Sequence, residues 1–321
     1  MYSNANFPKS LQYWYNGSFH DWSEGPLHPM THALHYGTSV FEGIRAYNTA
    51  KGTAIFRLPE HIDRFLHSAS VLCMQVPYTK DEIINLAKAT MLKNKLASGY
   101  IRPVLFYAFG NLGLVPKSCP VELAIGAWEW GAYLGKSAIK GASVFIVPWR
   151  RLHHTQIDMK AKVGGIYAQS TLNGIEARAK GFDEAVFLNL EGRIAEGPGE
   201  NIFIIRGKTL RTNSVSESIL EGITRMSVLE FAADAGYKTE VSPITKEDLF
   251  TADEAFFSGT AVEISPIIRV TDGSDAKAPA KEHVIGKGEP GPVTLDIRRN
   301  FMDIVGGQSK KFEKWLTYVN K

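Results

Sequence analysis

Between Asp183 and Arg211 the sequence contains a run of short strand patterns joined by tight turns, which indicates a sheet built largely from hairpins. The strand patterns cover residues 183–190, 193–195, 201–206 and 209–211, and the Glu191-Gly192 turn separates the first two. Within this run, Glu196-Gly197-Pro198-Gly199-Glu200-Asn201 is too rich in glycine and proline to belong to a ladder of paired strands. We therefore expect a special loop at residues 196–201.

Helix and strand patterns both recur along the rest of the chain. Asn16-Gly17 between two aromatic-rich strands is the strongest two-residue hairpin signal, and Thr79-Lys80-Asp81-Glu82 is a capping box that opens a helix. The other expected elements, in chain order, are a strand at 54–57, a helix at 59–72, the end of the capped helix at Gly99, strands at 99–107, 121–128 and 143–148, a helix at 168–180 ended by Gly181, a helix from Gly222 that ends before Gly236, a strand at 254–261, and, after irregular residues, a C-terminal helix from Pro292. The fold class expected is α+β.

The chain is long enough for two hydrophobic cores. With 321 residues, 44% of them hydrophobic, two domains are the better expectation. Residues 131–136 carry little regular pattern, so we expect a first domain at residues 1–130, an interdomain loop at 131–139 and a second domain at 140–321.

Composition also restricts the partners and the compartment. The formal net charge of +3 comes from interspersed acids and bases, without the basic tract that nucleic acid or an anionic membrane requires, whereas small acidic metabolites remain possible. Cys73 and Cys119 lie far apart, without a second cysteine or histidine at metal-binding spacing, so no metal site is expected. The sequence has no apolar run of membrane-spanning length and no signal-peptide pattern, which predicts a reduced, cytoplasmic protein.

The stretch Asp158-Met159-Lys160-Ala161-Lys162-Val163-Gly164-Gly165-Ile166-Tyr167 places lysines beside a flexible Gly-Gly step, with a tyrosine just beyond. A lysine becomes a covalent catalyst when it is held, deprotonated, near a carbonyl, and pyridoxal phosphate is the commonest biological carbonyl of this kind. Most lysines are solvated surface charges, so this stretch needs support from elsewhere in the chain.

A pyridoxal phosphate site also needs donors for the phosphate and an anion for the ring nitrogen, and the sequence offers candidates for both. Gly222-Ile223-Thr224 opens a helix whose first N–H groups can bind phosphate, and Ser258-Gly259-Thr260 and Arg64 can add to it. Glu196 is a candidate for the ring nitrogen, because a carboxylate stabilises the protonated ring. Taken singly, these residues are equally an ordinary helix cap, a tight turn, a surface arginine and a solvated turn residue.

Aromatic and arginine residues supply candidates for a substrate pocket. Arg45 and Arg102 lie on predicted strands, where an arginine needs a carboxylate or phosphate partner unless it is exposed. The aromatic candidates, which are equally ordinary core residues, are Tyr36, Phe41, Tyr100, Trp130, Tyr133 and Tyr167.

Taken together, these motifs resemble the branched-chain amino-acid aminotransferases, which are pyridoxal phosphate enzymes of fold type IV. The resemblance runs along nearly the whole chain. Its most specific markers are His35-Tyr36-Gly37-Thr38-Ser39-Val40-Phe41-Glu42-Gly43-Ile44-Arg45, Tyr100-Ile101-Arg102-Pro103, Gly131-Ala132-Tyr133-Leu134-Gly135 and residues 196–201.

The resemblance implies which residues bind the cofactor. Lys162, which immediately precedes Val163-Gly164-Gly165-Ile166-Tyr167, would carry pyridoxal 5'-phosphate, and Lys160 would be a bystander. Tyr167 would hydrogen-bond the ring hydroxyl, Glu196 would face the ring nitrogen and Leu220 would pack against the ring. The phosphate would be held by Arg64, Ile223, Thr224 and Thr260.

For the substrate, the resemblance implies that Tyr100 and the Thr260-Ala261 backbone receive the α-carboxylate, and that Arg102 meets the distal carboxylate of glutamate. Arg45 is a further substrate-binding candidate. The apolar side-chain pocket would be formed by Tyr36, Phe41, Trp130 and Tyr133.

The implied architecture is that of D-amino-acid aminotransferase-like enzymes: a small N-terminal α/β domain, a larger C-terminal domain with a barrel-like sheet that holds the lysine, and a cleft completed by a partner subunit. A homodimer is the smallest assembly expected. The implied activity is the reversible ping-pong transfer of the amino group of leucine, isoleucine or valine to 2-oxoglutarate. Ile166, Ala195 and Val262 stand where asparagine, serine and alanine are frequent in the family, which bears on fine substrate preference.

Three related enzymes share the same cofactor chemistry: D-amino-acid aminotransferase, the R-selective amine transaminases and aminodeoxychorismate lyase. Residues 41–45 and 131–135 favour the branched-chain enzyme over all three. A non-catalytic relative that binds a phosphorylated ligand is a different class of alternative. The joint presence of Lys162, Glu196, Arg64 and Thr224 argues against it.

Overall fold

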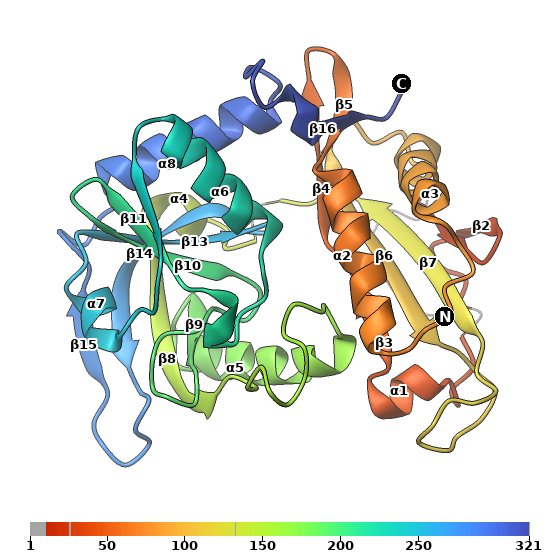
Figure 1. Cartoon of the computed structure of the whole chain (residues 1–321), viewed down its shortest axis with the longest axis horizontal. Coiled ribbons are helices and arrows are strands. Elements are labelled where there is room, and N and C mark those ends of the chain that lie inside the picture. The colour runs from red at the N-terminus through yellow and green to blue at the C-terminus, as the bar shows by residue number, and fades with distance from the viewer. Residues whose placement is uncertain (1–10, 26, 132, 321) are drawn as a thin grey trace. The chain divides into compact units, whose positions relative to one another are not determined.

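The computed structural model describes residues 11–25, 27–131 and 133–320, and the chain folds into two compact units (Figure 1). The first unit contains the chain up to Trp130 together with residues 161–166 and the residues from Asp303 onward, and the second contains residues 131–160 and 167–302. The sequence analysis placed residues 161–166 and 303–321 in the second domain, and the structure corrects both. The reason is backbone pairing, because Phe41 N donates to Lys162 O at 3.1 Å and the C-terminal strand β16 pairs with β5.

The first unit is built on one sheet in which every strand pair is antiparallel. The strand order is β16-β5-β4-β6-β7-β1-β2, with β3 beside β6. Asn16 and Gly17 adopt positive φ in the β1–β2 turn, as the hairpin signal predicts. The strands are β1 Gln12–Tyr15, β2 Ser18–Asp21, β3 Ser39–Phe41, β4 Ile44–Thr49, β5 Gly52–Phe56, β6 Gly99–Tyr107, β7 Val121–Trp128 and β16 Leu316–Tyr318.

Three helices belong to this unit: α1 (His32–Tyr36), α2 (Leu58–Val71) and α3 (Lys80–Lys93). The predicted face of α2 is buried at Ile62, Phe65 and Ala69, and the predicted capping box at Thr79 opens α3. The expected end of this helix at Gly99 is wrong. Helix α3 stops at Lys93, because the Asn94 side chain donates to Thr90 O and exchanges hydrogen bonds with the Gln12 backbone.

The second unit has a mixed sheet with the order β12-β11-β10-β13-β14-β8-β9 and β15 beside β14. The pairs β11–β12, β14–β8 and β8–β9 are parallel. Residues 193–195, predicted as a strand, form none. Instead Ile194 makes isolated bridges to Leu188 in β9 and to Ile244 just beyond β12 and so links the two ends of the strand order, as a barrel-like sheet requires. The strands are β8 Ala142–Arg150, β9 Glu184–Leu188, β10 Asn201–Arg206, β11 Thr209–Thr212, β12 Lys238–Val241, β13 Glu254–Gly259, β14 Glu263–Asp272 and β15 Lys281–Val284.

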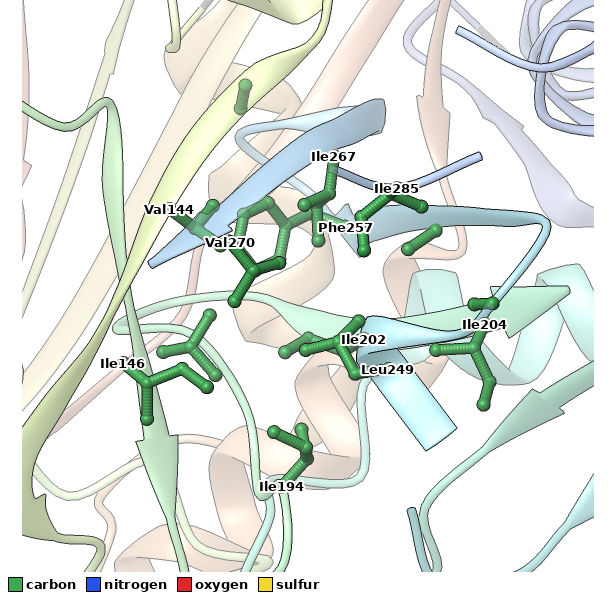
Figure 2. Close-up of a cluster of buried hydrophobic side chains, with 14 of the residues drawn as sticks. Val144, Ile146, Ile194, Ile202, Ile204, Leu249, Phe257, Ile267, Val270 and Ile285 are labelled. Carbon is green, nitrogen blue, oxygen red and sulfur yellow. The ribbon is translucent and has the colours of Figure 1, made fainter. Parts of the chain in front are cut away.

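The core of this unit is a cluster of aliphatic side chains around Phe257 (Figure 2). Ile194 belongs to that cluster, together with side chains from β8, β10, β13 and β14. Among the described residues, no helix has both the length and the apolar character needed to cross a membrane. The helices are α4 Ser137–Lys140, which lies at the end of the predicted interdomain loop, α5 Tyr167–Ala179, α6 Ile223–Asp234, α7 Lys246–Phe250 and α8 Pro292–Val305.

Candidate active site

Lys162 is fixed by its backbone in the first unit. Its N–H donates to Ser68 Oγ on α2 at 2.8 Å, its carbonyl accepts from Phe41 N, and the next residue, Val163, forms an antiparallel bridge with Val40. The Lys162 Nζ lies 4.9 Å from the centre of the Phe41 ring. Lys160, in contrast, is exposed. The surroundings therefore support Lys162 as the reactive lysine.

The Gly-Gly step after Lys162 is required by close backbone approach. Gly165 N donates to Gly37 O at 3.1 Å, and Gly37 has φ +66°, where a Cβ would lie 2.7 Å from Gly165 Cα. A Cβ on Gly164 would overlap Ser39 Oγ. These glycines allow the lysine segment to lie directly against residues 37–41.

Beside Lys162 is a group formed by Phe41, Tyr100, Arg102 and Trp130. Arg102 Nη2 donates to Tyr100 Oη at 2.9 Å, and its guanidinium carbon lies 4.8 Å from the Phe41 ring centre. The Tyr100 ring stacks on Trp130 with centroids 4.8 Å apart. Arg102 Nε is buried and has no hydrogen-bond partner among the described residues. A buried unpartnered donor is costly, so this group is suited to receive an acceptor such as a carboxylate.

Arg45 and Tyr36 differ from this group in their contacts. Arg45 Nη2 donates to Trp130 O at 3.1 Å, so this arginine helps to hold the backbone of Trp130. Tyr36 lies on α1, where its Oη donates to Leu112 O at 2.8 Å and its ring contacts His32. The contacts of Tyr36 thus connect it to residues 32 and 112 rather than to Phe41.

Arg64 lies on α2 and makes a two-pronged contact with Glu42. Arg64 Nε and Nη2 donate to the two carboxylate oxygens at 2.6 and 2.9 Å. Glu42 is wholly buried and also contacts His61. The sequence analysis quoted Glu42 in a motif but gave it no role.

In the second unit, the Glu196 carboxylate is buried and both of its oxygens are hydrogen-bonded. Oε1 receives Arg151 Nε at 3.0 Å and Nη2 at 2.9 Å, and Oε2 receives Leu220 N at 3.0 Å and Asn201 Nδ2 at 3.1 Å. The predicted special loop thus holds a carboxylate in one orientation. Arg151 is a residue that the sequence analysis missed, because its only signal is this pairing across 45 residues.

Helix α6 begins beside the same loop. Its N-cap residue, Gly222, has no side chain to accept from the first-turn N–H groups, and a Cβ there would overlap Asn201 Oδ1. Ile223 and Thr224 form the first turn. This end of a twelve-residue helix can therefore offer backbone N–H groups and the Thr224 hydroxyl to an anion.

Ser258 and Thr260 lie at the end of β13 in the same unit. Ser258 is buried, and its Oγ has no hydrogen-bond partner among the described residues. Thr260 and Ala261 are half-buried in the turn between β13 and β14. An unsatisfied hydroxyl beside a turn is consistent with a polar ligand at this strand end.

Tyr133 and Tyr167 also belong to the second unit. Tyr167 is the half-buried first residue of α5. Tyr133 lies 5.7 Å from the Arg178 guanidinium, and burial, with the nearby Glu200 and Glu184 carboxylates, raises the pKa of its phenol. Its surroundings are more charged than the predicted apolar pocket. Among the described residues, no group of His, Cys, Asp and Glu side chains is arranged to hold a metal ion.

Comparison with known proteins gives consistent matches. The model of the amino-transferase class IV family matches residues 39–270. A branched-chain-amino-acid aminotransferase from Pseudomonas aeruginosa is 44% identical over 308 residues, covering 95% of this chain and 96% of that protein.

Solved structures match to the same extent. The branched-chain amino acid aminotransferase of Escherichia coli has a TM-score of 0.90 and 37% identity, covering 97% of this chain and 100% of that one. A second branched-chain amino acid aminotransferase, solved with pyridoxamine 5'-phosphate from a source abbreviated T.th., has a TM-score of 0.90 and 44% identity, covering 97% of this chain and 99% of that one.

Proposed function

Since the chain belongs to the amino-transferase class IV family, we propose that it is a pyridoxal phosphate-dependent aminotransferase that exchanges the amino group of leucine, isoleucine or valine with 2-oxoglutarate. The observation that carries this proposal is the similarity, along nearly the whole chain, to enzymes named for branched-chain amino acids. The α+β fold is that of the fold-type IV enzymes among these relatives.

The described residues fit pyridoxal phosphate. The helix α6 N-terminus lacks a side-chain cap, the Ser258 hydroxyl lacks a partner, and Glu196 is a buried carboxylate. Together these suit a phosphate and a ring nitrogen. The residues proposed to hold the cofactor are Arg64, Lys162, Tyr167, Glu196, Leu220, Ile223, Thr224 and Thr260.

When bound, pyridoxal phosphate supplies an aldehyde that links covalently to an amine, and a ring that draws electrons from the substrate α-carbon. Lys162 is the proposed amine, and its Nζ also removes the proton from the α-carbon and returns a proton in the reverse half-reaction. The hydrogen bonds of its backbone to Phe41 and Ser68 keep this amine in place.

Substrate binding is proposed to depend on the group around Arg102. Tyr100 and the Thr260-Ala261 backbone receive the α-carboxylate, and the aromatic side chains form the pocket for leucine. The unsatisfied Arg102 Nε supports a role for this arginine in binding the second carboxylate of glutamate. Because Arg45 donates to the Trp130 backbone, its contribution is proposed to be indirect, through the position of Trp130.

The function is tested with purified protein, pyridoxal phosphate, L-leucine and 2-oxoglutarate. We expect formation of glutamate and 4-methyl-2-oxopentanoate in equal amounts, and similar exchange with isoleucine and valine. Exchange with D-alanine or a simple amine but not with L-leucine would point to one of the related enzymes instead. A protein without an absorbance band that shifts on addition of leucine would be a binding protein rather than a transaminase.

Replacing Glu196 with glutamine should slow the α-proton step by roughly 10²-fold, a typical size for losing one catalytic group, while cofactor affinity changes much less. A neutral amide cannot keep the ring nitrogen protonated, whereas the phosphate contacts remain. Single-turnover deamination of leucine measures the step. Glu200→Gln is the matched control, because Glu200 is a buried carboxylate of the same loop. Unchanged single-turnover rates in Glu196→Gln would exclude this role.

We further propose that the chain forms at least a homodimer and acts in the cytoplasm. Leu34, Leu114 and Val115 are exposed apolar residues of the first unit, and segments 28–36 and 109–115 lie together there through contacts such as His32 with Gly113. An exposed apolar surface of this kind is typical of a subunit interface. Cys73 and Cys119 are free thiols, in agreement with a reducing compartment. A single-chain mass by light scattering at micromolar concentration would contradict the dimer.

A further inference from the structure

The Glu42 carboxylate is closed off from solvent at the short connection between β3 and β4. It accepts from two nitrogens of Arg64, from His61 Nδ1 at 2.8 Å and from the Gly43 backbone N–H at 3.2 Å. Two parallel hydrogen bonds between one guanidinium and one carboxylate fix the direction of the arginine as well as its distance. Glu42 therefore determines where the Arg64 guanidinium lies.

The charges in this cluster are balanced. Burial acts to raise the pKa of the Glu42 carboxyl, but the charge of Arg64 and the contacts with His61 hold that pKa below its ordinary value. Burial lowers the pKa of His61, so this histidine is neutral at pH 7 and donates through its Nδ1–H. The cluster thus contains one carboxylate and one guanidinium, the arrangement in which a buried pair is tolerated.

The cluster has a closed side and an accessible side. None of the Glu42 side chain is exposed, whereas 13% of the Arg64 side chain is. On the same helix, Ser68 Oγ donates to Arg64 O at 2.7 Å and accepts from Lys162 N at 2.8 Å. Helix α2 therefore carries Arg64 and anchors the backbone of Lys162, the two residues of this unit proposed to hold the cofactor.

We propose that Glu42 is a positioning residue that holds the Arg64 guanidinium in place for the phosphate of pyridoxal phosphate. This inference rests on the phosphate role proposed above for Arg64. A free arginine side chain loses conformational entropy when it binds a ligand, and an arginine that the protein has already ordered avoids most of that loss. Glu42 therefore raises affinity for the phosphorylated cofactor without touching it.

The test compares two probes, pyridoxal phosphate and pyridoxal, which differ only in the phosphate. Each is titrated into the cofactor-free protein and its dissociation constant is measured from absorbance. For Glu42→Gln we expect pyridoxal phosphate to bind roughly 10-fold more weakly or worse, the size of losing a hydrogen bond between charged groups. Pyridoxal should bind within about 2-fold of the original protein, since it makes no phosphate contact.

A double-mutant cycle separates positioning from fold stability. Arg64→Met should weaken pyridoxal phosphate selectively, and adding Glu42→Gln to Arg64→Met should change its affinity by less than about 2-fold, because Glu42 then has no arginine to position. The double variant is also free of a stranded charge, so it remains measurable if Glu42→Gln alone folds poorly. Equal and additive losses for both probes would overturn the proposal and make Glu42 a purely structural residue.

Glu217→Gln is the matched control. Glu217 is another buried carboxylate held by two nitrogens of one arginine, Arg193, at 2.6 and 3.1 Å. We expect this variant to leave the ratio of the two dissociation constants unchanged. Because the probes are cofactor molecules, failure of the leucine assay would leave this experiment interpretable, whereas an unchanged ratio in Glu42→Gln would reject the positioning role alone.

Discussion

Replacing Lys162 with alanine should lower the rate of amino transfer from leucine by roughly 10³-fold or more, because one residue supplies both the covalent link and the proton transfer. No other lysine of the 158–167 stretch can take its place. Lys160 is exposed, and its backbone N–H is bound to Asp158, whereas the Lys162 Nζ lies against the Phe41 ring. Single-turnover rates with leucine measure the loss.

Lys160→Ala is the matched control, since it removes an amine two residues away and should keep at least half of the original rate. Borohydride reduction of the protein with bound cofactor, followed by peptide mapping, should place the label on Lys162. A label on Lys160, or normal turnover by Lys162→Ala, would refute the assignment.

The sequence predicted the elements that depend on local signals. The Asn16-Gly17 hairpin, the capping box at Thr79 and the end of α5 before Gly181 all follow from neighbouring residues, and all three are present. Tyr100 and Arg102, two residues apart on one strand, were expected on one face, and the hydrogen bond between them confirms it.

The missed strand β14 shows where local signals fail. Pro266 argues against a strand by local rules, because proline lacks the N–H that a ladder needs. In the structure Pro266 lies opposite Phe256 of β13, while pairing with β8 on the other side begins only at Ile267. Proline is tolerated because only one neighbouring strand requires pairing at that position.

The missed parts of the site are contacts between residues far apart in the sequence. Glu42 with Arg64, and Arg151 with Glu196, are buried pairs whose members lie 22 and 45 residues apart. The placement of residues 161–166 in the first unit likewise depends on the bridge between Val40 and Val163. Such pairs are set by packing of whole elements, so the motifs named the residues without naming what holds them.

Arg102 should decide whether the site accepts a second carboxylate. An aminotransferase that exchanges leucine with 2-oxoglutarate must bind an apolar and an acidic side chain in turn. Burying a carboxylate without a partner costs about 3–5 kcal/mol, which corresponds to roughly 10²-fold or more in specificity. Arg102→Ala should therefore lower kcat/KM for glutamate and 2-oxoglutarate by that factor.

Leucine should lose much less in the same variant, because its side chain makes no ionic contact. Some loss is expected from packing, since the guanidinium lies 4.8 Å from the Phe41 ring centre and 5.2 Å from that of Tyr100. Arg102→Met separates the two effects. Methionine keeps an apolar chain against these rings but no charge, so it should restore leucine and leave glutamate impaired.

Paired half-reactions with leucine and glutamate measure the selectivity directly, because each reports one substrate alone. Arg45→Ala is the comparison for the other strand arginine. Arg45 donates to the Trp130 backbone, and Trp130 stacks on Tyr100, so its loss should move the pocket wall and affect both substrates to a similar degree. Equal losses for both substrates in Arg102→Ala, together with a glutamate-selective loss in Arg45→Ala, would transfer the carboxylate-binding role from Arg102 to Arg45.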